Sequence, residues 1–513
     1  MAFAALSNGS APRHPTIVAT GDLDPDGRVR RVNMLEIKAA CFLKEIRGIH
    51  ALVYPAENEE PRECRLPETI PVSSLDEALF IRSLYRPGEA SRIAGFRRVL
   101  NEPGAFASGC ANLPPDWLRW AVRHGRHGRV ADALLSSQEL FEELIARLKT
   151  ALRDWNLNLS SALCAVLEPD AVQNASSAFP LAAFRWFALN LALANHEGDV
   201  GRAEDFASRA AALLERIEEV SPDEAAEYFA CRMVAAHNRY RFEPEIPPDL
   251  ARTLTRLENR YAAARSPRGT GFDLPLGKLY GTIGQNFAFC GPAYLSQALE
   301  WFAKARSVLG EGTIPDHERE WMRQLHYAAF ACLDAGKVFD AEDYLCRYLK
   351  VPSLAALAPE SLPPDSRWAH NLLARFLADV GPSGPAERYF EWAAACAFDP
   401  PGKEHPWQLW AYNLGRLAFS LGKPQAAAAC FRKSLELCLS AKPAVCVMAL
   451  LPLCGLSTLR GLPEDFPAIA VRIRGAAAGL NPKHFRAFLD QPLPQALEEN
   501  RERLPEFFPF TYR

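Results

Sequence analysis

Hydrophobic and polar positions follow two different spacings along the chain, and the change occurs near residue 86. After a short irregular stretch, residues 131–480 consist of alanine- and leucine-rich segments separated by turns that contain glycine or proline. Each segment is about 12–18 residues long and has apolar positions at helical spacing, with almost no alternation of β-branched residues. The pattern therefore predicts an all-α region over 131–480.

The first 86 residues show short β-type runs between two helical ones. Strands are predicted at 15–21, 28–32 and 50–55, and helices at 34–46 and 75–86. Ser74 and Glu77 form a capping box before the second helix. The order strand, strand, helix, strand, helix predicts a small α/β domain over 1–86.

Two further segments have neither pattern. Residues 87–130 contain prolines and glycines that interrupt any long helical period, so we expect a connector with short helices. Residues 481–513 predict a final helix followed by the aromatic tail LPEFFPFTYR. Because exposed aromatic side chains are unfavourable in water, we expect this tail to dock on the chain's own helices or, alternatively, to bind a partner.

Composition and charge narrow the classes of function. The chain has 513 residues, of which 49% are hydrophobic, and a formal net charge of -3, so a nucleic-acid or membrane partner spread over the whole surface is disfavoured. The first residues lack the basic start and long apolar core of a secretory signal. The most apolar segment, 441–459, contains Pro443 and Pro452, which favours buried helices over a membrane span. We therefore expect a cytoplasmic protein of open oligomeric state.

Motifs for metal or cofactor chemistry are missing from the sequence. Thirteen cysteines without a CxxC pair predict reduced, mostly buried thiols. No GxSxG, HExxH or phosphate-binding glycine loop occurs. Asp22, Asp24, Asp26 and Gly27 match the first half of a calcium loop, but a β-turn explains the same residues. We expect no metal and no cofactor.

A hairpin pattern recurs within the helical region. In 407–438, Gly415 lies in a first helix, Gly422 turns the chain, and Ala427 and Phe431 lie on one face of a second helix. The turn glycine, small residue and large apolar residue recur as Gly381, Ala386 and Phe390, as Gly336, Ala341 and Leu345, and as Gly291, Ala298 and Phe302. Antiparallel helices need a small residue where their axes approach, a large one to fill the next gap, and a glycine to turn.

These spacings resemble tetratricopeptide (TPR) repeats. The small residues Ala298, Ala341, Ala386 and Ala427 are 43, 45 and 41 positions apart. Since the family period is about 34 residues, each junction is expected to carry extra loop. The resemblance implies a mainly α fold, an α-solenoid of TPR-like hairpins; helical hairpins without repeat ancestry are the alternative.

Solenoids of this kind bind an extended peptide or a partner helix on the concave surface formed by their first helices. The side chains expected to project there are Gln285, His326, Asn371, Arg375, Tyr412 and Arg416. Amides and guanidiniums suit peptide carbonyls and carboxylates. The alternative is that these side chains merely solvate the groove.

Residues 20–58 resemble the last part of a Lon-type protease domain, in which a Thr-Gly strand leads through a turn to a helix and then to a strand ending in Pro-x-Glu-Asn. The matching residues are Thr20, Gly21, Gly27, Arg28, Val29, Leu35, Lys38, Gly48, Ile49, Pro55, Glu57 and Asn58. The resemblance covers residues 1–86 only and implies part of a fold like that of ribosomal protein S5 domain 2.

The Ser/Lys dyad that the resemblance would imply is not present in this sequence. The family's lysine follows the leucine that matches Leu35, and Glu36 stands in that place. Lys38 is roughly 200° further round the helix, so it should point away from the site. The segment that would carry the serine is missing, so we expect either a start codon placed too late or a half-domain that was lost or is supplied by another chain.

One basic-aromatic cluster occurs, in residues 117–129. Its possible nucleic-acid patch comprises Trp117, Arg119, Trp120, Arg123, Arg126 and Arg129. Aromatic rings beside guanidiniums suit single-stranded nucleic acid, but a helix that buries its tryptophans and solvates its arginines is commoner. His124 and His127 have no carboxylate or cysteine beside them to complete a metal site.

The sequence thus predicts a non-enzymatic scaffold or adaptor that binds a protein or peptide partner through a TPR-like array, with an inactive Lon-like module. One alternative is a truncated Lon-like serine peptidase in which the array recruits substrate. The other is nucleic-acid binding through 117–129.

Overall fold

The computed structural model describes residues 16–510 except 46–48, 62–67, 85–89, 218–219, 265–272, 311–313, 364–365, 397–399 and 401–404. The chain divides into two compact units, Met1–Leu189 and Asn190–Arg513. The boundary falls within α10 (Pro180–Glu197).

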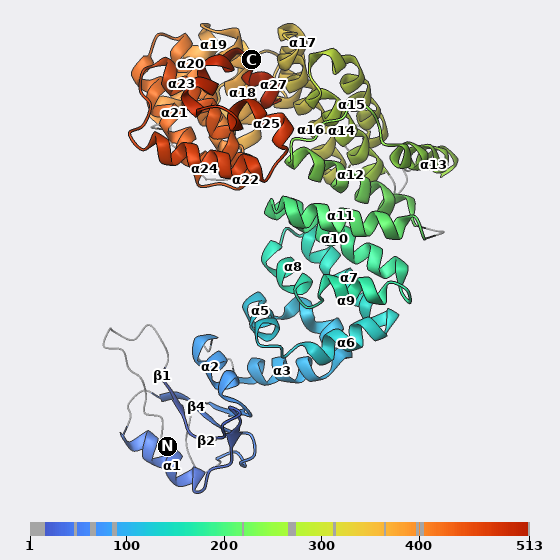
Figure 1. Ribbon diagram of the computed structural model, residues 1–513, viewed down its shortest axis with the longest axis vertical. Helices are drawn as coiled ribbons and strands as arrows, with labels where there is room; N and C mark the ends of the chain where they lie inside the picture. Colours follow the sequence, from blue (N-terminus) through green and yellow to red (C-terminus); the bar gives the residue numbers. More distant parts are fainter. Residues whose placement is uncertain are drawn as a thin grey trace. The chain divides into compact units, whose positions relative to one another are not determined.

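The first unit begins with a small parallel sheet of order β1-β4-β5 (Figure 1). Its strands are β1 (Thr16–Ala19), β4 (Ile49–Pro55) and β5 (Thr69–Val72), and β2 (Asp22–Leu23) pairs with β3 (Val29–Arg30) in a separate antiparallel hairpin. Helix α1 (Leu35–Glu45) packs on the sheet through buried Leu35 and Ala39, next to Val18 and Leu52. The α/β opening thus contains the expected elements, with β2 and β5 in addition.

The Asp-rich segment that follows β2 is a β-turn. The N–H of Gly27 donates to the carbonyl of Asp24 at 3.0 Å, and Gly27 has a φ of 76°, in the left-handed region that glycine favours. The side chain of Asp24 accepts a hydrogen bond from Arg30 at 2.8 Å. The turn therefore accounts for Asp24 and Gly27 without a bound cation.

Short helices make up the rest of the first unit. They are α2 (Leu75–Leu84), α3 (Ala90–Asn101), α4 (Pro103–Gly109), α5 (Pro115–Arg123), α6 (Gly128–Ser136), α7 (Gln138–Arg153), α8 (Leu157–Cys164) and α9 (Pro169–Ala175). Pro103, Pro115 and Pro169 each open a helix, where a missing N–H costs nothing. The prolines that interrupt the periodicity therefore mark helix starts.

The second unit consists of helices that pair along the chain (Figure 1). They are α11 (Val200–Leu214), α12 (Pro222–Asn238), α13 (Pro248–Ala264), α14 (Asp273–Phe289), α15 (Leu295–Leu309), α16 (Pro315–Asp334), α17 (Val338–Leu349), α18 (Arg367–Val380), α19 (Gly384–Ala395), α20 (Trp407–Ser420), α21 (Pro424–Leu439), α22 (Pro443–Cys446), α23 (Leu450–Thr458), α24 (Phe466–Ala478), α25 (Pro482–Leu489), α26 (Leu493–Glu499) and α27 (Leu504–Phe507).

The predicted hairpins are confirmed as α14–α15, α16–α17, α18–α19 and α20–α21. Each turn glycine has a positive φ, from 70° at Gly422 to 108° at Gly291. A Cβ on Gly415 would lie 2.5 Å from the ring of Phe431, so the two helices of that hairpin approach as closely as the pattern requires. The chain is a mainly helical, TPR-like repeat protein.

The apolar segment 441–459 forms α22, a short 3-10 turn and α23, with Leu450, Leu451 and Leu453 buried. Among the residues that the structure describes, no helix is both long and apolar enough to span a bilayer.

Tyr240, just after α12, joins the beginning of the second unit to its end. Its hydroxyl donates to the carbonyl of Ala444 at 2.8 Å, and its own carbonyl accepts from the side chain of Asn481 at 3.1 Å. Its ring lies 4.9 Å from Phe485 and stacks on His484 at 5.6 Å. The last helices therefore pack back onto α12.

Candidate functional site

A ladder of buried charges crosses three successive hairpins. The guanidinium of Arg375 on α18 is 0% exposed and contacts Asp334 at the end of α16 at 2.8 Å and Asp379 on its own helix at 2.9 Å. Arg416 on α20 contacts the second oxygen of Asp379 at 2.6 Å. Acid and base alternate, so each buried charge has a partner of opposite sign.

The ladder sets the protonation of its members. Burial acts to lower the pKa of Arg375, but Asp379 and Asp334 outweigh it and raise that pKa. Burial acts to raise the pKa of Asp379, yet Arg375 and Arg416 hold it below its usual value. For Asp334, burial prevails over Arg375 and the pKa is raised. Asp334 is therefore the least well compensated carboxylate of the ladder.

The C-terminal tail docks beside Asp334. The backbone N–H of Phe510 donates to Oδ2 of Asp334 at 2.7 Å. The ring of Phe510 lies 4.7 Å from Phe289 at the end of α14, and it stacks on Phe330 at 5.5 Å and on Tyr327 at 6.1 Å, both on α16. The tail thus docks on the chain's own helices; Tyr512 lies outside the described residues.

These contacts define one surface, which we call the first-helix face. It comprises the side chains that α14, α16, α18 and α20 place two and six residues before their turn glycines, namely Phe289, Phe330, Asp334, Arg375, Asp379 and Arg416. Tyr327 adjoins it, and Arg323 lies over the Tyr327 ring at 5.3 Å. Trp368 of α18 is 39% exposed and contacts His326 at 5.4 Å.

Asn286 on α14 holds a non-helical stretch of main chain. Its side-chain Nδ2 donates to the carbonyl of Glu243, and its Oδ1 accepts from the N–H of the same residue. A cavity of about 180 Å³ lies against this pair, lined in part by Arg232, His237 and Glu245. A more open cavity of about 810 Å³ adjoins Glu243 and is walled on its other side by Asn481 to His484.

The expectation that the predicted groove residues project from the surface is corrected by the structure. Gln285, His326, Asn371, Arg375 and Tyr412 are buried, and Arg416 is half-buried. Neighbouring helices and the tail satisfy these side chains internally. Asn413 donates to Asn371 at 3.1 Å, Gln285 hydrogen-bonds Tyr327, and Tyr412 packs 5.8 Å from Phe431. The ring of His326 is enclosed by Tyr327, Phe330, Tyr348 and Trp368.

The sequence reasoning missed Phe289, Asp334 and Asp379. Each stands two residues before a turn glycine, at Gly291, Gly336 and Gly381. The same register that identified the repeat would have placed these three side chains in one row. The polar choices six and ten residues before the glycines were weighed as surface groups because a sequence does not show which charges pair.

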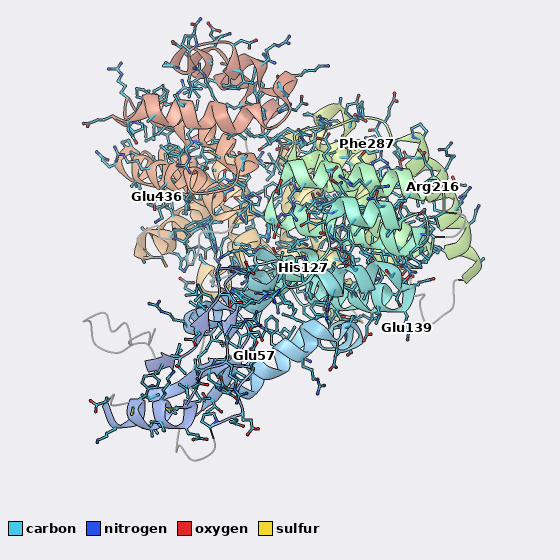
Figure 2. The ribbon with its side chains drawn as sticks, turned by 60° about the horizontal axis from the view of Figure 1, so that its bottom comes forward. Glu57, His127, Glu139, Arg216, Phe287 and Glu436 are labelled. Atoms are coloured by element: carbon cyan, nitrogen blue, oxygen red, sulfur yellow. The ribbon has the colours of Figure 1, made fainter. Side chains whose placement is uncertain are left out.

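The basic-aromatic segment lies in α5 and the turn that follows. Trp117 is buried edge-on against Phe96 at 5.4 Å, and Trp120 is half-buried. Arg119 bonds Asp116 and the carbonyl of Asn158, and Arg126 donates to Ser74. The side chains of Arg123, Arg126 and Arg129 are exposed, with His127 beside them at the start of α6 (Figure 2). Since its ring is packed in the core, Trp117 is not available to stack on a base.

The Lon-like positions are structural in the first unit. Glu57 at the end of β4 (Figure 2) accepts from the N–H of Arg31 and pairs with Arg30 at 3.1 Å, and both contacts lower its pKa. Asn58 exchanges two hydrogen bonds with the main chain of Val32. Glu36 is half-buried and Lys38 exposed in the first turn of α1.

Among the described residues, no three His, Cys, Asp or Glu side chains gather as metal ligands would. The described cysteines form no disulfide. Several are buried, and burial raises the pKa of Cys332 and of Cys430 to about 12, which keeps both as thiols at neutral pH.

No protein-family model matches the chain, and no curated protein matches it. Three solved structures show distant similarity. The chain is 13% identical to BtubC (BKLC) from P. vanneervenii over 58% of this chain and 90% of that one, with a TM-score of 0.26. It is 12% identical to NprR in complex with its cognate peptide NprX (71% and 99%, TM-score 0.36) and 13% identical to the apo form of the quorum sensor NprR from B. thuringiensis (72% and 99%, TM-score 0.36). At these TM-scores the likenesses assign no function.

Proposed function

We propose that this chain is a non-enzymatic adaptor that binds a peptide or protein segment along the first-helix face. The observation that carries the proposal is the grip of Asn286 on Glu243. A side-chain amide that both donates to a carbonyl and accepts from the N–H of one residue recognises extended main chain whatever its side chains are. The helical array already performs this operation on its own loop.

The polar and aromatic groups around this amide support the same activity. The alternating ladder from Asp334 to Arg416 fixes charged side chains without leaving one unpaired, so the face is preorganised. Arg323 and Trp368 leave 42% and 39% of their surfaces open next to it. Tryptophan and arginine are the residue types that contribute most to binding at protein interfaces.

The test is selection of peptides from a random display library against the full chain, followed by fluorescence anisotropy with the enriched peptides. We expect Trp368→Ala and Arg323→Ala each to weaken binding by about tenfold, the change that corresponds to about 1.4 kcal/mol. Trp155→Ala in the first unit and Arg319→Ala, an exposed residue of α16, are the matched controls and should bind normally. Equal binding by all four variants would refute the assignment of this face.

For the first unit we propose a Lon-like remnant without peptidase chemistry. The parallel sheet and the bonds from Glu57 and Asn58 to the β3 segment support the resemblance. Glu36 supports inactivity, because a carboxylate in place of the dyad lysine does not deprotonate a serine in the same geometry. Hydrolysis of unfolded casein by the purified chain, lost on Glu36→Ala, would contradict this proposal and favour the peptidase alternative.

A further inference from the structure

We propose that the tail residue Phe510 occupies the recognition pocket of the adaptor, so that the true ligand is a peptide with an aromatic side chain that must displace the chain's own tail. This inference rests on the proposed function and adds to it the ligand class and its regulation. The pocket consists of Phe289, Tyr327, Phe330 and Asp334.

The pocket selects an aromatic ring by geometry. Phe289 meets Phe510 at 65° between ring planes, whereas Phe330 and Tyr327 lie nearly parallel to it, at 26° and 17°. Edge-on and stacked contacts are the two arrangements that aromatic pairs favour, and an aliphatic side chain gains neither of them. A phenylalanine, tyrosine or tryptophan of a partner would find the same three rings.

The pocket also recognises main chain. Asp334 accepts the N–H of Phe510 at 2.7 Å, while its other oxygen is held by Arg375. A carboxylate fixed by an arginine is a strong acceptor for a backbone donor, and every residue except proline supplies that donor. The ligand is therefore a peptide whose aromatic residue keeps its own N–H, rather than a free aromatic compound.

The tail is seated as a displaceable occupant. Phe510 has a φ of 65°, a left-handed conformation that is unfavourable for an aromatic residue. Phe507 and Phe508 are buried, whereas Pro509 and Phe510 are only half-buried. The chain is thus anchored up to Phe508, and the strained residue beyond it can leave without unfolding that anchor. A ligand that enters the pocket in an extended conformation avoids this strain.

Competition in trans tests the inference. The probe is an acetylated peptide of residues 508–513, FPFTYR, with fluorescein on an added C-terminal lysine. We expect the full chain carrying Phe510→Ala to bind it at least tenfold more tightly than the native chain, because a tethered occupant competes at an effective concentration of order millimolar. Phe339→Ala, at a residue that is 89% exposed on α17, is the matched control and should bind like the native chain.

Further variants keep the test decisive. If Phe510→Ala lowers the melting temperature too far, Phe510→Leu fills the space without the ring contacts and should give the same gain. The probe with alanine in place of its second phenylalanine should bind none of the chains, and Phe289→Ala should remove the gain. Equal affinity of the probe for native and Phe510→Ala chains, or unchanged affinity of the alanine probe, would overturn the inference. Library peptides that still depend on Trp368 would in that case leave the adaptor function intact.

Discussion

Arg375 illustrates how a residue that looks like a binding group becomes part of the core. Its position on a first helix suggested contact with a partner, but its guanidinium is fully enclosed between Asp334 and Asp379. The sequence contained the evidence in part, since Asp379 is four residues after Arg375, a spacing that favours an ion pair on a helix. The contact with Asp334 joins different hairpins, and only the packing of α16 against α18 reveals it.

Replacing Arg375 should be costly for this reason. In Arg375→Met both carboxylates lose their buried partner, and we expect the free energy of unfolding to fall by about 3–5 kcal/mol. Arg319→Ala, which breaks an exposed pair with Asp316, should change it by less than about 0.5 kcal/mol. Urea unfolding of both variants measures the difference; similar small losses would show that the ladder is not energetically coupled.

Two buried histidines make stability depend on pH. Burial lowers the pKa of His237 to about 4, and burial followed by the charge of Arg323 lowers that of His326 to about 3. In the unfolded chain histidine titrates near pKa 6.5, so below that pH the unfolded state takes up protons that the folded state does not. Stability is therefore full above about pH 6.5 and declines as the pH falls toward 4.

We expect His326→Phe to flatten this decline. Each histidine contributes up to about 1.4 kcal/mol per pH unit, so the variant should lose less stability than the native chain between about pH 6 and pH 5. His317→Phe, at the partly exposed start of α16, is the matched control. Urea unfolding at both pH values is the measurement, and identical slopes for native and His326→Phe chains would contradict the assignment.

Hairpins were the most predictable elements because their pattern is local. Gly415, Gly422 and Phe431 lie within 17 positions, and each has a steric reason to stand where it does. Strand β5 was missed because Thr69–Val72 is short and contains Pro71, and only its parallel pairing with β4 makes it a strand. Long-range pairing is not encoded in the periodicity of a segment.

Gly415→Ala tests the close approach within a hairpin. The added Cβ would meet the ring of Phe431 at 2.5 Å, and we expect a loss of about 1–3 kcal/mol from overpacking. Gly475→Ala in α24, where nothing lies within 4 Å, should instead stabilise the chain by about 0.4–1 kcal/mol. Opposite signs in chemical denaturation would confirm that packing, and not helix propensity, fixes Gly415.

At the scale of the whole second unit, Tyr240 has the largest reach. It contacts residues more than 200 positions away, so the early hairpins and the last helices share one core. No sequence pattern announced this, because Tyr240 follows α12 in a left-handed conformation, outside any repeat. Tyr240→Ala should lower the free energy of unfolding by about 3–5 kcal/mol, as for other large buried rings.

Hydrogen exchange can show that this loss is shared by both ends. In Tyr240→Ala the amides of α12 and of α25 should exchange faster together, whereas Phe419→Ala, at an exposed residue of α20, should leave both unchanged. Faster exchange in α25 alone would indicate that the last helices are only an appendage.

This joining of distant helices by Tyr240 bears on how the chain reaches its native state. An open array of repeats can nucleate at any hairpin and grow along its axis, since every contact is local. Here α12 completes its core only when residues beyond 440 have been synthesised, and contacts of such sequence separation slow folding. The early hairpins of the second unit therefore leave the ribosome with an uncovered apolar surface, which makes them natural clients of a chaperone until the last helices arrive.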